Sequence, residues 1–414
     1  MIKKNFLRSF KNVLFGSVVA QFIPFLGSLV ITRIYFPGEF GSYSIWLGAV
    51  MTAAVVVTCR LEMALGVEPD GEDRRFAMVA VLTTTSLVCI MLILVMISIY
   101  SFVPQIRDLS LSLILMFFPA TFLLSLLNCW QSYASVEGAY RELSIIRIMQ
   151  AFWITLIQIV IGYIFPDAVS LAIGFFIGVL LGLLTAAYFI PIDLSYFSRL
   201  SIFKSQLWDF WFKHRDFPRY ALLADTINII SGQLPILIIG SKFGAEFSGF
   251  YAFTSRIVGA PISLFGAAAL DVFKRMAAES YRKYGNCRKE YRYTFILLAS
   301  LGAALAIGVT LIAESAFVFL FGETWRQSGV IAVWLVPLFA MRFIASPLSY
   351  TFYIAGKQRV DLIWQCTLLI MTLLIFYFLG NFEMIIRTYA IGYGCLYVLY
   401  LVLSYRYSSI SRLK

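Results

Sequence analysis

One stretch of the sequence, residues 76–100, reads FAMVAVLTTTSLVCIMLILVMISIY and contains no charged side chain. It is long enough to cross the hydrocarbon core of a bilayer as an α-helix, which needs about 20 apolar residues. A membrane β-barrel would instead show segments of about ten residues with alternating polarity. Similar apolar runs recur along the chain, so the sequence predicts an all-α polytopic membrane protein with about twelve transmembrane helices. We expect spans at residues 13–35, 42–59, 76–100, 109–131, 145–165, 168–190, 219–240, 247–270, 293–313, 329–355, 361–380 and 384–404.

The composition excludes a water-soluble protein. Of the 414 residues, 61% are hydrophobic and 13% are charged, and the mean hydropathy is +0.85. A soluble domain cannot cover so much apolar surface, so lipid is the expected solvent. The net charge of +11 lies mainly in short loops beside apolar spans. There it indicates orientation and contact with anionic membrane lipids, and we expect no nucleic-acid partner.

The basic residues alternate along the chain. With these spans, 24 of the 33 Lys and Arg residues fall at the chain ends or in every second connection, and two more, Arg147 and Arg219, are among the first three residues of the spans that follow such a connection. Cytoplasmic loops carry this excess in membrane proteins, so both termini are predicted to face the cytoplasm. The basic start of the chain resembles a signal peptide, but the following span is too long and lacks a small-residue cleavage site. We therefore expect the first helix to be retained.

The chain shows no catalytic or metal-binding pattern. Its six cysteines form no CxxC pair, which argues against disulfides and a thiolate metal site. No phosphate-binding loop of the form GxxxxGK[ST] is present, so ATP is not expected to be the direct energy source. The single histidine, His214, lies among basic residues of a predicted cytoplasmic loop, where we expect it to be solvated. The sequence thus predicts a protein that is not an enzyme and uses no cofactor or metal.

The loop at residues 191–218 mixes aromatic and basic side chains. A helix lying in the lipid headgroup layer would have this composition. An ordinary linker between two halves of the protein is the alternative, and the two interpretations are compatible. The residues concerned are Lys204, Trp208, Phe210, Trp211, Phe212, Lys213, His214 and Arg215.

A short repeat divides the chain into two similar halves. The sequence FPGEF at residues 36–40 follows the first span, and FGAEF at residues 243–247 follows the seventh. Both copies precede a Gly and a Tyr within four residues. Two parallel halves related by an axis normal to the membrane are typical of transporters, with the substrate site between them. We predict six-helix halves at residues 1–190 and 219–414 around a central cavity, joined by a cytoplasmic linker at 191–218.

Several arginines lie inside or at the ends of the predicted spans. A charge at the bilayer centre costs about 2.5–3.5 kcal/mol, so such residues are candidate functional groups. Arg33, Arg60 and Arg147 lie near span ends, where snorkelling to the headgroups is an alternative. Arg256 and Arg342 lie deeper. Because a guanidinium binds phosphate through a rigid two-pronged geometry, we predict an anion-accepting cavity with Arg33, Arg60, Arg256 and Arg342 as substrate-binding candidates.

Two carboxylates are candidates for ion coupling. Asp225 is well inside the seventh span, where it could pair with an arginine or exchange a proton. Glu62 lies beside Arg60 and could exchange an ion or simply pair with that arginine. Proline and glycine also predict interrupted helices in the spans that carry Arg33, Asp225, Arg256 and Arg342, a feature that alternating-access transporters use. These residues are Pro24, Gly27, Gly232, Pro235, Pro261, Gly266, Pro337 and Pro347.

Three stretches resemble a known family. The strongest, residues 215–278, contains DFPRY before the seventh span, QLP within it, and GFY ahead of an Arg and the run PISLF. TRIYFPGEFGSYSIW near the N-terminus and SPLSYTFYIAGKQR after the tenth span also fit. In order and spacing these motifs are similar to those of the polysaccharide-unit flippases (Wzx-type, O-antigen and capsule translocases) of the multidrug/oligosaccharidyl-lipid/polysaccharide (MOP) transporter superfamily. The resemblance extends over essentially the whole chain.

The resemblance implies a function. Members of this family move undecaprenyl-pyrophosphate-linked oligosaccharides from the inner to the outer leaflet of the bacterial inner membrane, as part of lipopolysaccharide O-antigen or capsule synthesis. The expected partners are the lipid-linked oligosaccharide, membrane lipids, an O-antigen polymerase and a chain-length regulator. Arg256 is similar in placement to cavity arginines of the related lipid II flippases, and Arg33 and Arg60 less closely so. No acidic motif of the family falls at Asp225, and twelve spans depart from the fourteen of the lipid II flippases.

Two other functions compete with this one. A polysaccharide polymerase or ligase would also have many spans, but such enzymes carry a large periplasmic loop, and here the predicted periplasmic connections are short. A small-molecule or multidrug exporter of the same superfamily would bind lipophilic cations, which favours carboxylates. The deep charges here are mainly arginines, which favours an anionic substrate.

Overall fold

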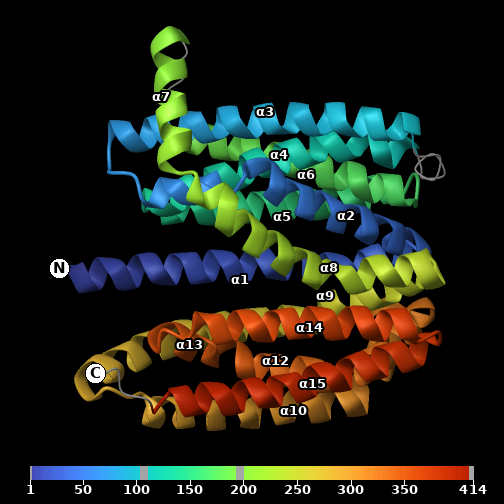
Figure 1. Cartoon of the computed structure of the whole chain (residues 1–414). Helices are drawn as coiled ribbons and strands as arrows, with labels where there is room; N and C mark the ends of the chain where they lie inside the picture. The colour runs from blue at the N-terminus through green and yellow to red at the C-terminus, as the bar shows by residue number, and fades with distance from the viewer. Residues whose placement is uncertain (1, 103–110, 193–199, 410–414) are drawn as a thin grey trace. The chain divides into compact units, whose positions relative to one another are not determined.

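The computed structural model describes residues 2–102, 111–192 and 200–409, and these residues form helices and connecting turns without a strand. The chain forms two compact units, Met1–Leu237 and Ile238–Lys414. In the first unit, α3 to α6 run side by side (Figure 1). Its elements are α1 (Ile2–Ile34), α2 (Pro37–Thr58), the 3₁₀ helix η1 (Leu61–Gly66), α3 (Glu72–Phe102), α4 (Leu111–Val136), α5 (Tyr140–Gly162), α6 (Ala168–Phe189), α7 (Leu200–Lys213), the π-helix η4 (Phe217–Ala221) and most of α8 (Leu222–Phe243).

The second unit contains the end of α8 and the helices that follow it. Helix α12 packs against α9, α10 and α15, and forms the centre of this unit. The elements are α9 (Ala245–Tyr284), α10 (Arg288–Phe321), η5 (Glu323–Trp325), α11 (Arg326–Trp334), α12 (Val336–Leu348), α13 (Tyr350–Ile354), α14 (Gln358–Phe378) and α15 (Phe382–Tyr407).

The all-α membrane fold expected from the sequence is confirmed. Among the described residues, nine helices are long and apolar enough to cross a membrane. A tenth span results if the bent pair Glu323–Trp334 and Val336–Ile354 crosses as one. Each of the twelve predicted spans coincides with a described helix or with this bent set, α1 and α9 included.

The predicted helix interruptions are wrong at three of the four places. Pro24, Pro235 and Pro261 lie inside the continuous helices α1, α8 and α9. A proline removes one backbone hydrogen bond, and in a membrane bundle neighbouring helices and side chains compensate for this loss without ending the helix. The interruption in the tenth span is present, because α11 ends at Trp334 and α12 begins with Pro337 in its first turn, with a bend of 57° between the segments.

Small residues hold α5 and α6 at close range. Gly174, Gly178 and Gly182 share one face of α6 at four-residue spacing, the pattern that lets membrane helices approach closely. A Cβ at Gly178 would lie 2.5 Å from the backbone nitrogen of Ile154 on α5. The two helices therefore touch backbone to backbone, and this contact fixes α5, which carries one wall of the site described below.

The two copies of the sequence repeat occupy equivalent places. Pro37 starts α2 directly after α1, and Gly244 precedes the start of α9 directly after α8. In the first copy Glu39 accepts a hydrogen bond of 2.9 Å from the backbone nitrogen of Ala168, the first residue of α6. A carboxylate at a helix N-terminus compensates the unpaired amides and the helix dipole there. The repeat thus marks the tight turn between the first two helices of each predicted half.

Candidate functional site

A polar cleft of about 450 Å³ opens in the first unit where α2, η1, α4 and α5 meet. The cleft lies at the C-terminal ends of α2 and α4 and near the start of α5, which are the ends that the sequence places on the cytoplasmic side. Its volume falls in the range of small-molecule sites, about 300–1,000 Å³. The polar side chains that line it are Arg60, Glu62, Asn128, Gln131, Ser132, Ser135 and Arg147.

The backbone at Arg60 adopts a conformation that is uncommon for residues with a side chain. Cys59 and Arg60 have φ angles of 50° and 58°, in the left-handed region. This conformation costs free energy for residues other than glycine, and such residues concentrate at functional sites. The two left-handed residues end α2 and begin η1, so they set the direction from which the Arg60 side chain enters the cleft.

Arg60 holds two of the predicted carboxylates. Its Nη1 donates to Oε1 of Glu62 at 3.0 Å, and its Nε lies 2.7 Å from Oδ2 of Asp225 in the first turn of α8. The structure therefore brings together three residues that the sequence singled out separately. Of the two readings of Asp225, pairing with an arginine is the one present in this structure.

Glu62 is the most enclosed charged residue of the cleft. Its side chain is 5% exposed, and one oxygen accepts from Arg60. The other oxygen, Oε2, is buried without a hydrogen-bond partner among the described residues. An unpaired buried carboxylate oxygen is costly, so Oε2 is a natural acceptor for a hydroxyl or amide of a bound ligand.

Arg147 on α5 lines the same cleft from a different helix. Its Nε lies 3.4 Å from Oε1 of Gln131, whose Nε2 donates to Oε1 of Gln150 at 3.1 Å. The hydrogen-bonded amides of Gln131 and Gln150 restrict the position of the Arg147 guanidinium from one side. Two arginines and one carboxylate line the cleft, and Asp225 also pairs with Arg60, so an anion would compete with these carboxylates for the guanidinium groups.

The other predicted arginines lie elsewhere. Arg33 is exposed in the last turn of α1, at the end opposite the chain start, and does not line the cleft. Arg256 is half-buried on α9 of the second unit. Arg342 on α12 has an exposed side chain and lies near the hydroxyl groups of four tyrosines. These belong to Tyr251, Tyr389, Tyr393 and Tyr397.

The tyrosines beside Arg342 form a polar stripe in the second unit. Tyr389, Tyr393 and Tyr397 recur every four residues along α15, with ring centroids 5.1 and 5.4 Å apart. Tyr251 of α9 hydrogen bonds with Tyr389. Phenolic oxygens accept hydrogen bonds and do not neutralise a cation, so Arg342 keeps its full charge for an anion.

Sequence reasoning missed the buried carboxylate of Asp361. Asp361 lies in the first turn of α14, is 8% exposed, and accepts from Tyr400 at 2.7 Å and from Gln365 at 2.9 Å. It is the first residue of the predicted span 361–380, and the sequence analysis did not single it out. The four-residue spacing from Gln365 is a signal that could have placed both side chains on one helix face.

The expectation that His214 is solvated is wrong. The side chain is 4% exposed, and its Nε2 lies 2.5 Å from Oε1 of Glu68. The ammonium group of Lys213 forms an ion pair of 2.7 Å with the same oxygen. Burial by itself would raise the pKa of Glu68, but the hydrogen bonds and charges of Lys213 and His214 lower that pKa below its ordinary value. Helix packing overrides the polar composition here, because Phe210 and Phe217 lie against the imidazole ring.

The comparisons with known proteins agree with this architecture. A family model described as "Polysaccharide biosynthesis protein" matches residues 30–330. By sequence, no curated protein matches the chain.

Solved structures with a similar fold include the lipid II flippase MurJ in an inward closed conformation. It has a TM-score of 0.71 at 14% identity over 95% of this chain and 87% of that one. An inward-facing multidrug resistance MATE family transporter of the MOP superfamily gives 0.69 at 12% identity, over 94% and 95%. A MOP superfamily transporter from Pyrococcus furiosus gives 0.59 at 14% identity, over 97% and 95%.

At these identities the structures establish the fold, and the family model covers well over half of the chain. Both agree with the resemblance that the sequence motifs carry. The chain belongs to the polysaccharide biosynthesis protein family and has the multi-pass membrane fold of the MOP superfamily of transporters and flippases.

Proposed function

We propose that this protein translocates lipid-linked oligosaccharide repeat units, joined to undecaprenyl through a diphosphate, from the inner to the outer leaflet of a bacterial inner membrane by alternating access. The observation that carries the proposal is the cleft that Arg60 and Arg147 line in a member of a polysaccharide biosynthesis family. O-antigen or capsule units are the substrate class. Both termini would face the cytoplasm, where the units are assembled.

The cleft has the chemistry to receive the head of such a substrate. A diphosphate offers several anionic oxygens, and arginine matches them with parallel N–H donors. The amides and hydroxyls of Asn128, Gln131 and Ser132 add donors and acceptors suited to sugar hydroxyls. Because the cleft lies at the predicted cytoplasmic ends of the helices, it would be the loading site.

The second unit would supply further positive charge along the path. Arg256 and Arg342 are our candidates for this role, and Arg33 is the candidate near the outer end of α1. Asp225 and Glu62 are the candidates for ion coupling, since each pairs with Arg60 and would be freed when an anion takes over the guanidinium.

A multidrug exporter is the second candidate, because a MATE family transporter is nearly as similar in fold as the lipid II flippase. Such an exporter would need an anionic cavity for lipophilic cations. The two arginines that line the cleft of the first unit support the anionic substrate. An O-antigen polymerase and a chain-length regulator are the partners that we propose, and we propose no catalytic step.

The test is loss of the gene in a cell that makes the polysaccharide. We expect lipid-linked repeat units to accumulate in the inner leaflet, protected in intact spheroplasts from an added glycosidase and accessible after lysis. Units that reach the periplasm and fail only to polymerise or be ligated would instead indicate an enzyme. Normal polysaccharide with increased sensitivity to cationic dyes would indicate the multidrug exporter.

A further inference from the structure

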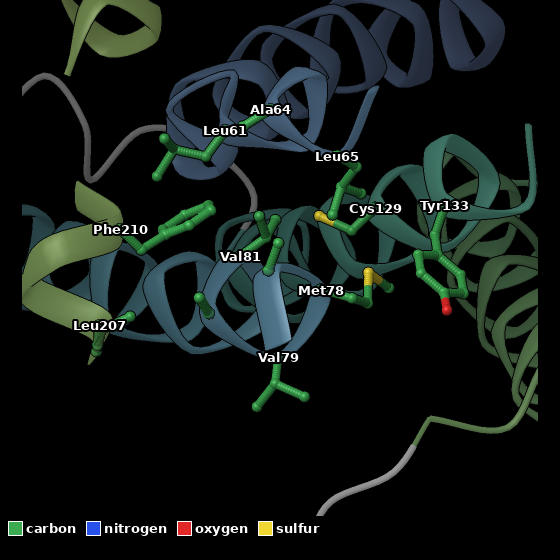
Figure 2. Packing of buried hydrophobic residues seen from close by; sticks show 12 residues of the cluster. Leu61, Ala64, Leu65, Met78, Val79, Val81, Cys129, Tyr133, Leu207 and Phe210 are labelled. Atoms are coloured by element: carbon green, nitrogen blue, oxygen red, sulfur yellow. The ribbon is translucent and has the colours of Figure 1, made fainter. Parts of the chain in front are cut away.

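Helix α7 is fixed to the first unit by one of its faces. Leu207 and Phe210 are buried in a cluster with residues of η1, α3 and α4, and Figure 2 shows Phe210 pointing between Leu61 and Val81. The indole nitrogen of Trp211 donates to Oγ1 of Thr84 at 2.7 Å. These contacts lie at spacings of three and four residues, so a single face of α7 is docked.

One ion pair, from Lys213, and one polar contact, from His214, complete this attachment. Lys213 and His214 reach Glu68, whose side chain is 6% exposed. The backbone oxygen of Glu68 in turn accepts from Arg74 of α3 at 3.0 Å. The C-terminal end of α7 is therefore held to the loop between η1 and α3 by buried polar contacts as well as by apolar packing.

The remainder of α7 divides into two exposed stripes with different chemistry. Lys204, Trp208 and Phe212 follow one another at four-residue spacing and share one flank of α7, and Arg215, in the turn directly after α7, lies over Phe212 and extends this flank. The other flank carries polar residues, among them Gln206, Asp209 and Lys213, and no aromatic residue. We call the first flank the aromatic-basic stripe.

The aromatic-basic stripe has no protein to cover it among the described residues. Trp208 is 67% exposed and Phe212 is 64% exposed. The guanidinium carbon of Arg215 lies 4.5 Å from the centroid of the Phe212 ring, so charge and aromatic surface form one patch. Large exposed aromatic side chains beside basic residues are typical of helices in the headgroup layer of a membrane.

The direction of α7 agrees with a position in that layer. In Figure 1, α7 crosses the end of α3 and does not run along the bundle that α3 to α6 form. A helix that crosses the ends of transmembrane helices lies parallel to the membrane surface. The end that it crosses is the start of α3, on the side that carries most of the loop Lys and Arg residues, where anionic lipids are enriched.

The geometry points to the aromatic-basic stripe as a binding surface for the anionic lipid headgroups of the cytoplasmic leaflet. Trp208 and Phe212 insert at the level of the glycerol and upper acyl chains, while Lys204 and Arg215 contact lipid phosphates. The polar flank faces water. This inference does not rest on the transported substrate, because it uses only contacts and charges of the first unit.

The test places a nitroxide label at one position of α7 at a time, in the full-length protein with its six native cysteines replaced by serine or alanine. The positions are Trp208→Cys and Phe212→Cys on the stripe, with Gln206→Cys and Asp209→Cys as matched exposed controls. The protein is reconstituted into vesicles of phosphatidylglycerol and phosphatidylethanolamine, and accessibility to oxygen and to a water-soluble nickel complex is measured.

We expect labels at 208 and 212 to favour oxygen over nickel, and labels at 206 and 209 to favour nickel. Adding Lys204→Glu and Arg215→Glu should shift the 208 label towards nickel, because the acidic side chains repel the anionic surface. Equal accessibility at all four positions would overturn the inference. Shielding of 208 and 212 from both reagents would overturn it as well, because it would indicate that protein, rather than lipid, covers the stripe.

Discussion

The Nε atom of Arg60 lies 2.7 Å from the Asp225 carboxylate, although 165 positions separate the two residues in the chain. The side chains are 23% and 29% exposed, so the pair is partly open to solvent. Partly exposed ion pairs contribute little net stability, about 0–1 kcal/mol. We therefore expect that an arriving phosphate would replace the Asp225 carboxylate at modest cost.

Reversing the two charges separates a role in export from a role in the fold. Arg60→Asp combined with Asp225→Arg keeps an ion pair between η1 and α8, so we expect it to accumulate in the membrane better than Arg60→Asp alone; both variants remove the arginine partner of Glu62 equally. Polysaccharide export should fall by about tenfold or more, because a hydrogen bond to a charged group contributes about 1.5–3 kcal/mol and its geometry would be lost. Arg141→Ala, an exposed arginine of α5, serves as the control. Normal export by the double variant would assign the pair a purely structural role.

The arginines of the second unit have their own test. Replacing Arg256 or Arg342 by Ala should abolish export while leaving the protein in the membrane at normal level. Lys should rescue only partly, because it lacks the two-pronged guanidinium. Export and membrane level are measured together for all four variants. Abundant Ala variants that export normally would refute the site, and variants that fail to accumulate would show that the arginines hold the helices together.

The docking of α7 should depend on acidity through Glu68. Burial acts to raise its pKa, but Lys213 and His214 lower it below the ordinary value. A carboxyl whose pKa is lower in the folded state stabilises that state at neutral pH, and this contribution is lost as the pH falls through the lowered pKa. A nitroxide at position 206 should therefore gain mobility only at a pH below the ordinary pKa of a glutamate carboxyl. In Glu68→Gln it should be more mobile already at neutral pH, and equal mobility of both proteins would contradict the role of Glu68.

The close contact of α5 and α6 predicts opposite effects at two glycines. Gly178→Ala places a Cβ 2.5 Å from the backbone nitrogen of Ile154, so we expect a loss of about 1–3 kcal/mol from overpacking. Gly308→Ala on α10 meets no atom within 4 Å and should stabilise slightly, by about 0.5–1 kcal/mol, because alanine favours a helix. Thermal unfolding in detergent measures both. Equal stability of the two variants would show that the contact is looser than described.

The orientation in the membrane is tested by reporter fusions. Fusions after Gly41, Asp167, Gly244, Glu323 and Asn381 should report the periplasm, because the basic residues concentrate in the alternate connections. A sixth fusion, after Gln105, falls outside the described residues. Two or more cytoplasmic readings would contradict both the orientation and the arrangement in two parallel halves.

The sequence predicted the helices better than the contacts between them. Uncharged runs such as residues 76–100 identify spans because lipid tolerates few exposed charges, and every predicted span coincides with described helices. The proline signal was less reliable, since Pro235 and Pro261 are accommodated within continuous helices. Hydropathy indicates whether a segment is surrounded by lipid or by water, whereas the continuity and path of a helix depend on the helices packed against it.

The candidate site was predicted in part. The cost of charge within a span singled out Arg60 and Asp225, but no pattern in one sequence indicates that they meet. Arg147 was expected among residues that could snorkel, and it lines the cleft because Gln131 and the packing of α5 on α6 fix its position. The burial of His214 was missed because its partner, Glu68, lies in a different loop.

The most direct measurement is translocation by the purified protein. Vesicles are loaded with lipid-linked oligosaccharide in both leaflets, and a membrane-impermeant glycosidase is added outside, with a proton or a sodium gradient imposed in turn. Without protein, the glycosidase cleaves only the oligosaccharide on lipids of the outer leaflet. We predict that the wild-type protein makes nearly all of the oligosaccharide accessible to the glycosidase. With Arg60→Ala, the oligosaccharide on lipids of the inner leaflet should stay protected. Protection of the inner-leaflet oligosaccharide in the presence of wild type under every gradient, in vesicles where the same protein accelerates export of a cationic dye, would contradict the proposed function.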